Sequence, residues 1–372
     1  MKIPIKAKQQ NTGDLSIVLL VAILTIFGTL MIFSASYYYS INQHDDPYHY
    51  LIRQLIWLAA GTVGMWVCSK IDYHFWVRLW VIAYAAGLVL LVLVLTPLGA
   101  SAYGATRWIE IGPITIMPGE IAKPCIILFV TGFFSRHPKW VTSLKYGIIP
   151  IVAAAGIYGG LIMKQPNMST AFTVCFIAGG MLLVAGARWL HLVGLSGLAG
   201  VAAAAFIFLD RSGYRYKRFL SFLDPFEDPL DTGWNVVQSL LALGTGGLTG
   251  RGLGNSIQKN LYLPMPQNDF ILAIIGEELG FIGILALMIV YLLLIWRGCH
   301  IAMNAKDLTG LLLASGIIIM VGVQVLINVA VVTSSMPPTG IILPFVSYGG
   351  NALLIFMGAM GILLNISKSS DF

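Results

Sequence analysis

Three acidic side chains stand at the start of one long apolar segment, and they are the first candidates for chemistry. Asp269 ends the stretch LPMPQND, and Glu277 and Glu278 follow inside the apolar run that reaches Trp296. A carboxylate at membrane depth is costly unless it faces protein, water or a cation, and such residues often mark functional sites. A carboxylate can act as a general base, bind a cation or pair with a basic residue.

The spacing of these carboxylates argues against a hydrolytic site built from two of them. On a helix, Glu277 lies about 12 Å along the axis from Asp269 and about 80° around it, and Glu278 lies about 180° around it. A glycosidase pair needs its carboxyl groups roughly 5 to 9.5 Å apart. Asp269 and the two glutamates therefore do not form such a pair, and we expect the glutamates to form ion pairs inside the protein.

Asp269 also suits a structural role as a helix cap. Pro264 and Pro266 cannot continue a helix, so the segment before Asp269 is expected to be extended and to lead into a helix start. An aspartate there accepts hydrogen bonds from unpaired N–H groups and suits the positive end of the helix dipole. Capping and catalysis both stay open, and the two roles can coexist.

Basic residues that could accompany Asp269 lie in the segments between apolar runs. Arg107 precedes a tryptophan in ATRWIEIGPITIMPGEIAK, and Glu120 and Lys123 are spaced i, i+3, so they can meet on one helical face. Arg218 belongs to a second basic group, RSGYRYKR. Each cation alone could be an interface anchor. Together they indicate an outward-facing site for a phosphorylated lipid.

Membrane-spanning helices must position these residues. Hydrophobic residues make up 58% of the 372 residues and charged residues only 10%, whereas soluble domains carry roughly 25% charged residues. Apolar runs of about 18 or more residues recur, which is enough to cross a roughly 30 Å hydrocarbon core, and they do not alternate as barrel strands would. The sequence predicts an all-α, polytopic integral membrane protein with a single domain over residues 1–372. The ten expected spans are 15–36, 50–68, 76–97, 120–134, 146–163, 170–186, 189–209, 269–296, 309–332 and 341–365.

The distribution of Lys and Arg predicts that both termini lie in the cytoplasm. With the N-terminus inside, twelve of the 22 Lys and Arg residues fall on the cytoplasmic side and only four fall in short outer loops. The one long connection, residues 210–268 between spans seven and eight, is then extracellular. Asp269 follows directly after this loop and lies on the outer face.

Other features exclude several classes of function. The net charge of +6 is spread among connections without a basic helix, so nucleic-acid binding is not expected. The four cysteines stand singly and form neither a zinc nor a disulfide pattern. GTGGLTGRGLGNS lacks GK[ST] and a preceding strand, so we expect a flexible or tightly turned loop rather than a phosphate loop. MPPTGIILPFVSYGGN predicts either a turn or a broken helix facing a cavity.

Several motifs resemble those of the SEDS family, which comprises RodA, FtsW and SpoVE. The resemblance extends over nearly the whole chain, and GRGLGNSIQKNLYLP is more similar to the FtsW/SpoVE branch. It implies a peptidoglycan glycosyltransferase of the bacterial cytoplasmic membrane, polymerising lipid II into glycan strands on the outer surface during cell division, elongation or sporulation. The motifs are FLDPFEDPLDTGWNVVQSLLALGTGGLTGRGLGNSIQKNLYLPMPQNDFILAIIGEELGFIG, LPFVSYGGN, RWIEIG…MPGEIAK and QPNMSTA.

The resemblance also implies roles for individual residues. The family's essential aspartate falls on Asp269, which would act as the base or orient the acceptor hydroxyl. Its outer-loop Arg, Glu and Lys fall on Arg107, Glu120 and Lys123, and the Arg before FLDP falls on Arg218. These residues would bind the substrate, with the three cations on the departing diphosphate. In an open alternative, Asp269 holds a divalent cation, Mg²⁺ or Mn²⁺, with the pyrophosphate.

Supporting roles are expected for Glu277, Glu278, Gln165 and Ser347. One position departs from the family pattern, because the usual Q-P-D reads Gln165, Pro166 and Asn167 here. An amide replaces the carboxylate, which argues against an ionic role for Asn167.

The resemblance implies two partners, lipid II as substrate and a class B penicillin-binding protein, which is a single-span transpeptidase. The alternative function is a lipid II flippase, because transporters also show helices broken by Gly or Pro and acidic residues within the membrane. A third reading, a scaffold that recruits other cell-wall enzymes, gives no role to Asp269.

Overall fold

The computed structural model describes residues 13–102, 105–112, 114–195, 197, 200, 222, 224–226 and 233–369. Within these residues, seven helical segments are long and apolar enough to cross a membrane, so the prediction of a multi-span helical protein is confirmed. They are α1 (Leu15–His44), α2 (His49–Lys70), Leu144–Lys164 with α6 (Ile149–Lys164), α7 (Met168–Ala185), α11 (Ile271–Met303), α12 (Leu308–Val332) and α13 (Gly350–Ser369).

Shorter elements connect and support these spans. A short apolar helix, α4 (Trp80–Leu93), falls within the predicted span 76–97, and α5 (Pro118–Arg136) covers the predicted span 120–134. Most of the predicted span 189–209 lies outside the described residues, so the count of ten spans stays a prediction. The other short helical elements are α3 (Tyr73–Arg78), a 3-10 turn (Pro138–Trp140), a π turn (Leu144–Ile148) and α10 (Trp234–Gly246).

The last span begins later than the sequence predicts. Residues 341–349 are not helical, and α13 starts only at Gly350. Pro337, Pro338 and Pro344 lack the N–H that a helix needs, and Gly340 has φ +71°. Of the two structures expected for MPPTGIILPFVSYGGN, the structure therefore has the turn.

A small sheet was not predicted. β1 (Gly99–Ala102), β2 (Ala105–Ile111) and β3 (Ile114–Ile116) form an antiparallel sheet in the order β1-β2-β3. Its register pairs Ile109 with Ile116, and the Asn351 amide of α13 donates to the Thr115 carbonyl oxygen at 2.5 Å. The sheet carries Arg107 on β2, so it fixes a predicted site residue that a plain loop would leave mobile.

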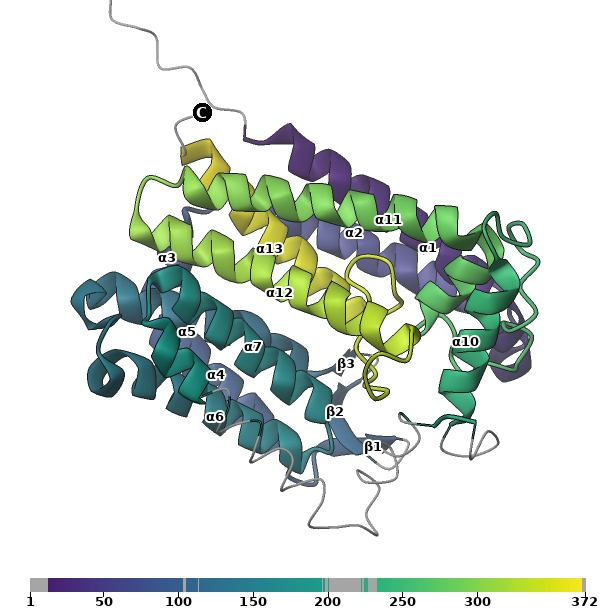
Figure 1. Cartoon of the computed structure of the whole chain (residues 1–372), viewed down its shortest axis with the longest axis horizontal. Coiled ribbons are helices and arrows are strands. Elements are labelled where there is room, and N and C mark those ends of the chain that lie inside the picture. The colour runs from purple at the N-terminus through teal and green to yellow at the C-terminus, as the bar shows by residue number, and fades with distance from the viewer. Residues whose placement is uncertain are drawn as a thin grey trace, which may run out of the picture.

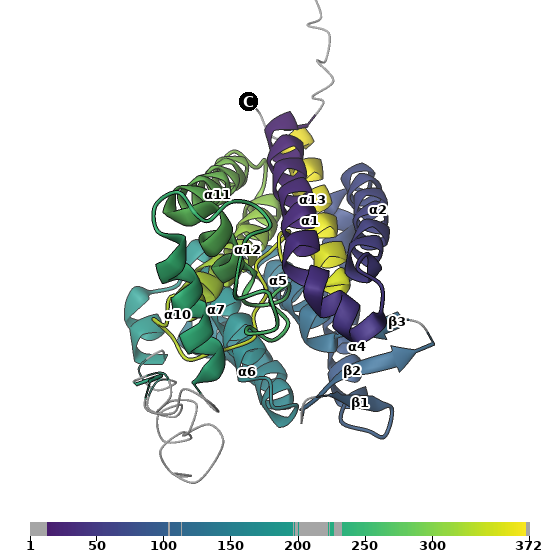
Figure 2. The ribbon, with the colours of Figure 1, turned by 90° about the vertical axis from the view of Figure 1, so that its right-hand side faces the viewer.

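α12 is the central helix of the domain. It contacts α5, α7, α11 and α13, and 67% of its most apolar window is buried, the largest share among the seven candidate spans. Figure 1 shows α4, α5, α6 and α7 on one side of it, and Figure 2 shows α1, α2 and α13 lying together. Side chains on α12 can therefore join elements that are far apart in the sequence.

The two ends of the helical domain differ in character. At one end, the Asp14 backbone N–H before α1 donates to Ser367 near the end of α13 (3.0 Å), and the Tyr73 backbone N–H donates to Asn365 (2.9 Å). The sheet and α10 lie at the opposite end (Figure 1). The first end carries the ends of α2, α3, α5 and α13 with their basic residues Lys70, Arg78, Arg136 and Lys368, which is the end predicted to be cytoplasmic.

Candidate functional site

Asp269 does not cap the helix that follows it. The cap position of α11 is Phe270, which makes no side-chain cap hydrogen bond. The capping role expected from the sequence is therefore wrong, because the chain turns through residues 265–270 and the helix starts at Ile271. The Asp269 side chain is partly exposed.

An asparagine on the central helix holds the backbone of Asp269. The Asn328 amide donates to the carbonyl oxygen of Asp269 at 2.8 Å and to that of Ile341 at 2.7 Å. The residue before Ile341, Gly340, lies beside the carboxylate, since a Cβ at this glycine would be 3.7 Å from Asp269 Oδ2. The segment 339–341 therefore forms one wall around Asp269.

The Glu120–Lys123 pair is formed as predicted and is buried. Lys123 Nζ lies 2.7 Å from Glu120 Oε1, and the Lys123 residue is only 1% exposed. The same ammonium donates to Gln324 Oε1 on α12 at 2.9 Å. Gln324 and Asn328 are one helical turn apart, so the ion pair and Asp269 attach to the same face of α12. Lys123 is not a snorkelling anchor at the membrane surface.

The turn between α6 and α7 brings Arg107 to this region. The Arg107 guanidinium on β2 donates to the carbonyl oxygen of Pro166. Gln165 donates to the Leu91 carbonyl oxygen at 2.9 Å and is buried. Asn167, which stands where the family has a carboxylate, caps α7 by accepting from the Thr170 N–H at 3.3 Å. An amide can perform this capping as well as a carboxylate.

These contacts converge on three consecutive residues. Ser169 of α7 donates to the Thr339 carbonyl oxygen at 2.5 Å, Gly340 lies beside Asp269, and Ile341 binds Asn328. Of the predicted residues, Asp269 lies beside this segment, Lys123 is connected to it through Gln324 on α12, and Arg107 binds the turn that precedes α7. Arg218 lies outside the described residues. Sequence reasoning missed Gln324 and Asn328, although two amides four residues apart in the apolar run VGVQVLINVAVV are a usable signal.

The two glutamates inside α11 have different partners. Glu278 pairs with Lys259 Nζ at 2.8 Å and accepts from Ser34 of α1 at 2.7 Å, so the predicted ion pair is present there. Within the part of the chain that the structure describes, Glu277 pairs with no cation. It instead accepts from Ser256 Oγ (2.5 Å) and from the N–H groups of Ile257 (2.9 Å) and Gln258 (3.2 Å). The ion-pair prediction is wrong for Glu277.

A break in α11 explains why acidic residues are tolerated there. Gly280 has φ +69° and ψ −169°, which are not helical values. Residues 270–278 before the break are all buried, whereas Phe281 and Ile282 after it are exposed. Glu277 and Glu278 therefore lie in a half-helix enclosed by protein, and only the segment after Gly280 shows a face to the surroundings.

The loop that follows α10 fills this break with its backbone. The Glu277 carbonyl oxygen accepts from Arg251 N–H (2.9 Å), and that of Glu278 accepts from Gly252 N–H (3.0 Å). On the other side of the break, Phe281 N–H donates to the Gly247 carbonyl oxygen at 2.9 Å. The backbone groups of Glu277, Glu278 and Phe281 at the break thus gain partners, as a membrane protein requires. Of the two expectations for GTGGLTGRGLGNS, the tightly turned loop is confirmed.

The segment before α13 is also tied to the start of α11. Ser347, predicted to be a supporting residue, accepts from the Leu343 N–H at 2.8 Å and is buried. The next residue, Tyr348, donates its N–H to the Gln267 carbonyl oxygen at 2.9 Å, two residues before Asp269. The loop 333–349 thus binds the chain just before Asp269 and also lies beside its carboxylate.

Comparison with known proteins identifies the family. The family model described as "Cell cycle protein", covering FtsW, RodA and SpoVE, matches residues 14–371. The chain belongs to the FtsW/RodA/SpoVE family. It is 40% identical to stage V sporulation protein E of Bacillus subtilis, over 98% of this chain and 99% of that protein. It is also 40% identical to the probable peptidoglycan glycosyltransferase FtsW of Trichlorobacter lovleyi, over 95% of this chain and 93% of that protein.

Solved structures share the fold. A chain of a peptidoglycan synthase complex, described for the coordination of polymerization and crosslinking, matches with a TM-score of 0.78 at 28% identity, covering 95% of this chain and 97% of that one. The rod shape determining protein RodA of Thermus thermophilus matches with a TM-score of 0.70 at 26% identity, over 97% and 98% of the two chains. This member of the FtsW/RodA/SpoVE family is a multi-pass protein of the cytoplasmic membrane.

Proposed function

We propose that this chain is a peptidoglycan glycosyltransferase that polymerises lipid II at the outer face of the cytoplasmic membrane, with Asp269 as its catalytic residue. The observation that carries the proposal is that α12 connects Asp269 with the buried Glu120–Lys123 pair. Its Asn328 binds the Asp269 carbonyl oxygen, and its Gln324, one turn away, binds Lys123. The named activity of the FtsW relatives supports it.

The chemistry needs one carboxylate and several cations. Asp269 takes the proton of the acceptor sugar hydroxyl while that oxygen forms a bond to C1 of the donor sugar. The bond between C1 and the diphosphate oxygen breaks, and its electron pair leaves with the diphosphate. Because the diphosphate is already a stable anion, no second carboxylic acid has to protonate it. This is why a site without a glycosidase pair suffices.

We assign Arg107, Lys123 and Arg218 to the stabilisation of the leaving diphosphate. Lys123 would act from a buried position, where charge is screened less than at the surface. Two of its three N–H groups are used by Glu120 and Gln324. Glu120 and Gln324 therefore set where this charge lies.

A divalent cation is a second proposed use of Asp269. Among the described residues, no group of three His, Cys, Asp or Glu side chains could hold a metal ion. Mg²⁺ is commonly held by one or two carboxylates together with substrate phosphates, and Asp269 with the diphosphate would meet this need. Polymerisation measured with EDTA and then with added Mg²⁺ or Mn²⁺ tests this assignment.

We also propose that both termini are cytoplasmic, that ten spans are present and that a class B penicillin-binding protein is the partner. The likeness to a chain of a peptidoglycan synthase complex supports the partner. The flippase alternative gains no support from the break in α11, because backbone from residues 247–252 fills it. In a transporter, such a break would line a substrate path.

The decisive test compares Asp269→Asn with a matched control, Asp45→Asn. Both changes remove one carboxylate at the same end of the domain, and Asp45 has φ +53°, a conformation that asparagine tolerates well. With purified protein and lipid II, we expect Asp269→Asn to slow glycan formation about 100-fold or more. Asp45→Asn should stay within about twofold of the parent.

The outcome also separates enzyme from carrier. Glycan chains made by the purified protein in liposomes favour the transferase, whereas translocation of lipid II without glycan chains favours the flippase. A folded Asp269→Asn protein that polymerises at the parent rate would make the catalytic assignment wrong.

A further inference from the structure

A basic pocket lies at the end of the domain opposite Asp269, and the proposed transferase reaction does not use it. Its volume is about 130 Å³. The walls come from α3, the end of α5 and the start of α12. The lining residues are His74, Val77, Arg78, Gly132, Ser135, Arg136 and Thr309.

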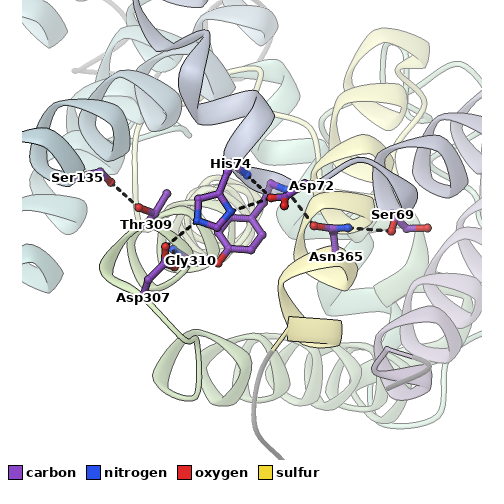
Figure 3. Close-up of polar contacts among 9 residues, drawn as sticks. Ser69, Asp72, His74, Ser135, Asp307, Thr309, Gly310 and Asn365 are labelled. Carbon is purple, nitrogen blue, oxygen red and sulfur yellow. Dashed lines mark hydrogen bonds and ion pairs between the residues drawn. The ribbon is translucent and has the colours of Figure 1, made fainter. Parts of the chain in front are cut away.

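Hydrogen bonds fix two walls of this pocket (Figure 3). His74 bridges two carboxylates, with Nδ1 2.8 Å from Asp72 Oδ1 and Nε2 2.8 Å from Asp307 Oδ2. Asp307 also caps α12 by accepting from Gly310 N–H at 2.8 Å. Thr309 donates to Ser135 Oγ at 3.0 Å, which leaves the Ser135 hydroxyl proton able to donate to a ligand.

Two arginines of the pocket have no acidic partner among the described residues. The charge of His74 is offset by Asp72 and Asp307, whereas neither Arg78 nor Arg136 lies within ion-pair distance of a carboxylate there. Arg136 stacks over the Trp80 ring, 5.4 Å from its centroid, which orients its guanidinium without neutralising it. With His74 protonated, the five ionisable groups carry a net charge of +1.

The surroundings place the pocket at the level of lipid headgroups. Aromatic side chains cluster beside it, with Trp80 packed on Phe129 and Phe133 packed on Trp140. Phe75, next to His74, is 48% exposed. Exposed aromatic rings next to Arg residues at helix ends are typical of the membrane–water interface.

We propose that this pocket binds the phosphate headgroup of an anionic phospholipid. Arg78 and Arg136 would pair with the phosphate oxygens, and the Ser135 hydroxyl would donate to one of them. A pocket of about 130 Å³ has room for a phosphate group while the acyl chains stay in the bilayer. Basic pockets between membrane helices bind anionic headgroups in this way.

The test uses the full-length protein in phosphatidylcholine nanodiscs and dioctanoyl phosphatidylglycerol as the probe. The double variant Arg78→Gln/Arg136→Gln removes both guanidinium groups. Each basic residue near an anionic surface is worth about fivefold in affinity, so we expect about 30-fold weaker binding by the double variant. Arg188→Gln removes an exposed arginine outside the pocket, after the end of α7, and should change binding less than twofold.

Two further arms identify the ligand and guard against misfolding. Dioctanoyl phosphatidylcholine should bind weakly, and inorganic phosphate should bind more weakly than the anionic lipid. Arg136→Lys keeps a cation over Trp80 and should retain most of the binding. Equal binding by the double variant and the parent would overturn the proposal. Phosphate binding as tightly as the lipid would overturn the lipid assignment in favour of a soluble phosphate.

Discussion

Replacing Gly250 with alanine should damage the broken helix more than the same change at any exposed glycine of the loop. A Cβ at Gly250 would lie 2.2 Å from the Glu278 carbonyl oxygen and 2.6 Å from Gly280 N, and Gly250 has φ +79°. The loop must therefore move away from α11. The two hydrogen bonds that Arg251 and Gly252 donate into the break would be lost with that movement.

Gly254 offers a matched control for the strain term. Its φ is +80°, yet the nearest atom to a Cβ there is Lys259 Nζ at 4.0 Å. Gly254→Ala should cost only the left-handed strain, about 1 to 2 kcal/mol. Gly250→Ala adds two buried carbonyl groups without partners, at about 1 to 3 kcal/mol each. The difference between the variants should then be about 2 to 6 kcal/mol.

Thermal unfolding of the detergent-purified variants at one fixed scan rate measures this difference. We expect Gly250→Ala to unfold at a clearly lower temperature than Gly254→Ala and to lose lipid II polymerisation. Equal unfolding temperatures for the two variants would refute the reasoning. The hydrogen bonds that Arg251 and Gly252 donate to α11 would then contribute nothing to stability.

Two other perturbations test the buried and exposed charges. Lys123→Met leaves the buried Glu120 carboxylate unpaired and should cost about 3 to 5 kcal/mol of unfolding free energy. Adding Glu120→Gln should restore most of that stability without restoring polymerisation. If the double variant polymerised lipid II, the Lys123 ammonium would have no role in the reaction. Burial lowers the pKa of His74, but its bonds to Asp72 and Asp307 outweigh this and raise the pKa above 6.5. The stability that protonated His74 adds to the folded state is therefore fully present below pH 6.5. It is lost as the pH rises through the pKa of His74 in the folded protein. His74→Gln should lower the free energy of unfolding more at pH 6 than at pH 9, with a difference of about 1 kcal/mol or less for such exposed pairs. An equal loss at both pH values would contradict the reasoning.

Local patterns made part of the site predictable. The Glu120–Lys123 pair follows from i, i+3 spacing on one helix, and the structure forms it at 2.7 Å. The position of Asp269 after two prolines gave the start of α11 within two residues. Such predictions succeed because they depend only on neighbours along the chain.

Long-range backbone contacts made the rest unpredictable. Gly280 stands in an apolar run that is continuous in composition, and only the N–H and carbonyl groups of a loop some 30 residues earlier stabilise the break there. Glu277 was expected to need a cation because the sequence cannot show that Ser256, Ile257 and Gln258 supply donors. The partner of a buried polar group is set by the tertiary fold.

The break at Gly280 also sets how deep Asp269 lies in the bilayer. The stretch from Phe281 to Met303 rises about 33 Å, and that from Leu308 to Asn328 rises about 30 Å. A short turn joins α11 and α12, so Phe281 and Asn328 finish at similar heights, about one hydrocarbon thickness from the basic end. Because Asn328 binds the backbone of Asp269, Asp269 lies at a similar height to Phe281. A sugar diphosphate carried by a lipid could then reach Asp269 while its hydrocarbon tail stays immersed, so no substrate would have to be lifted out of the membrane to react.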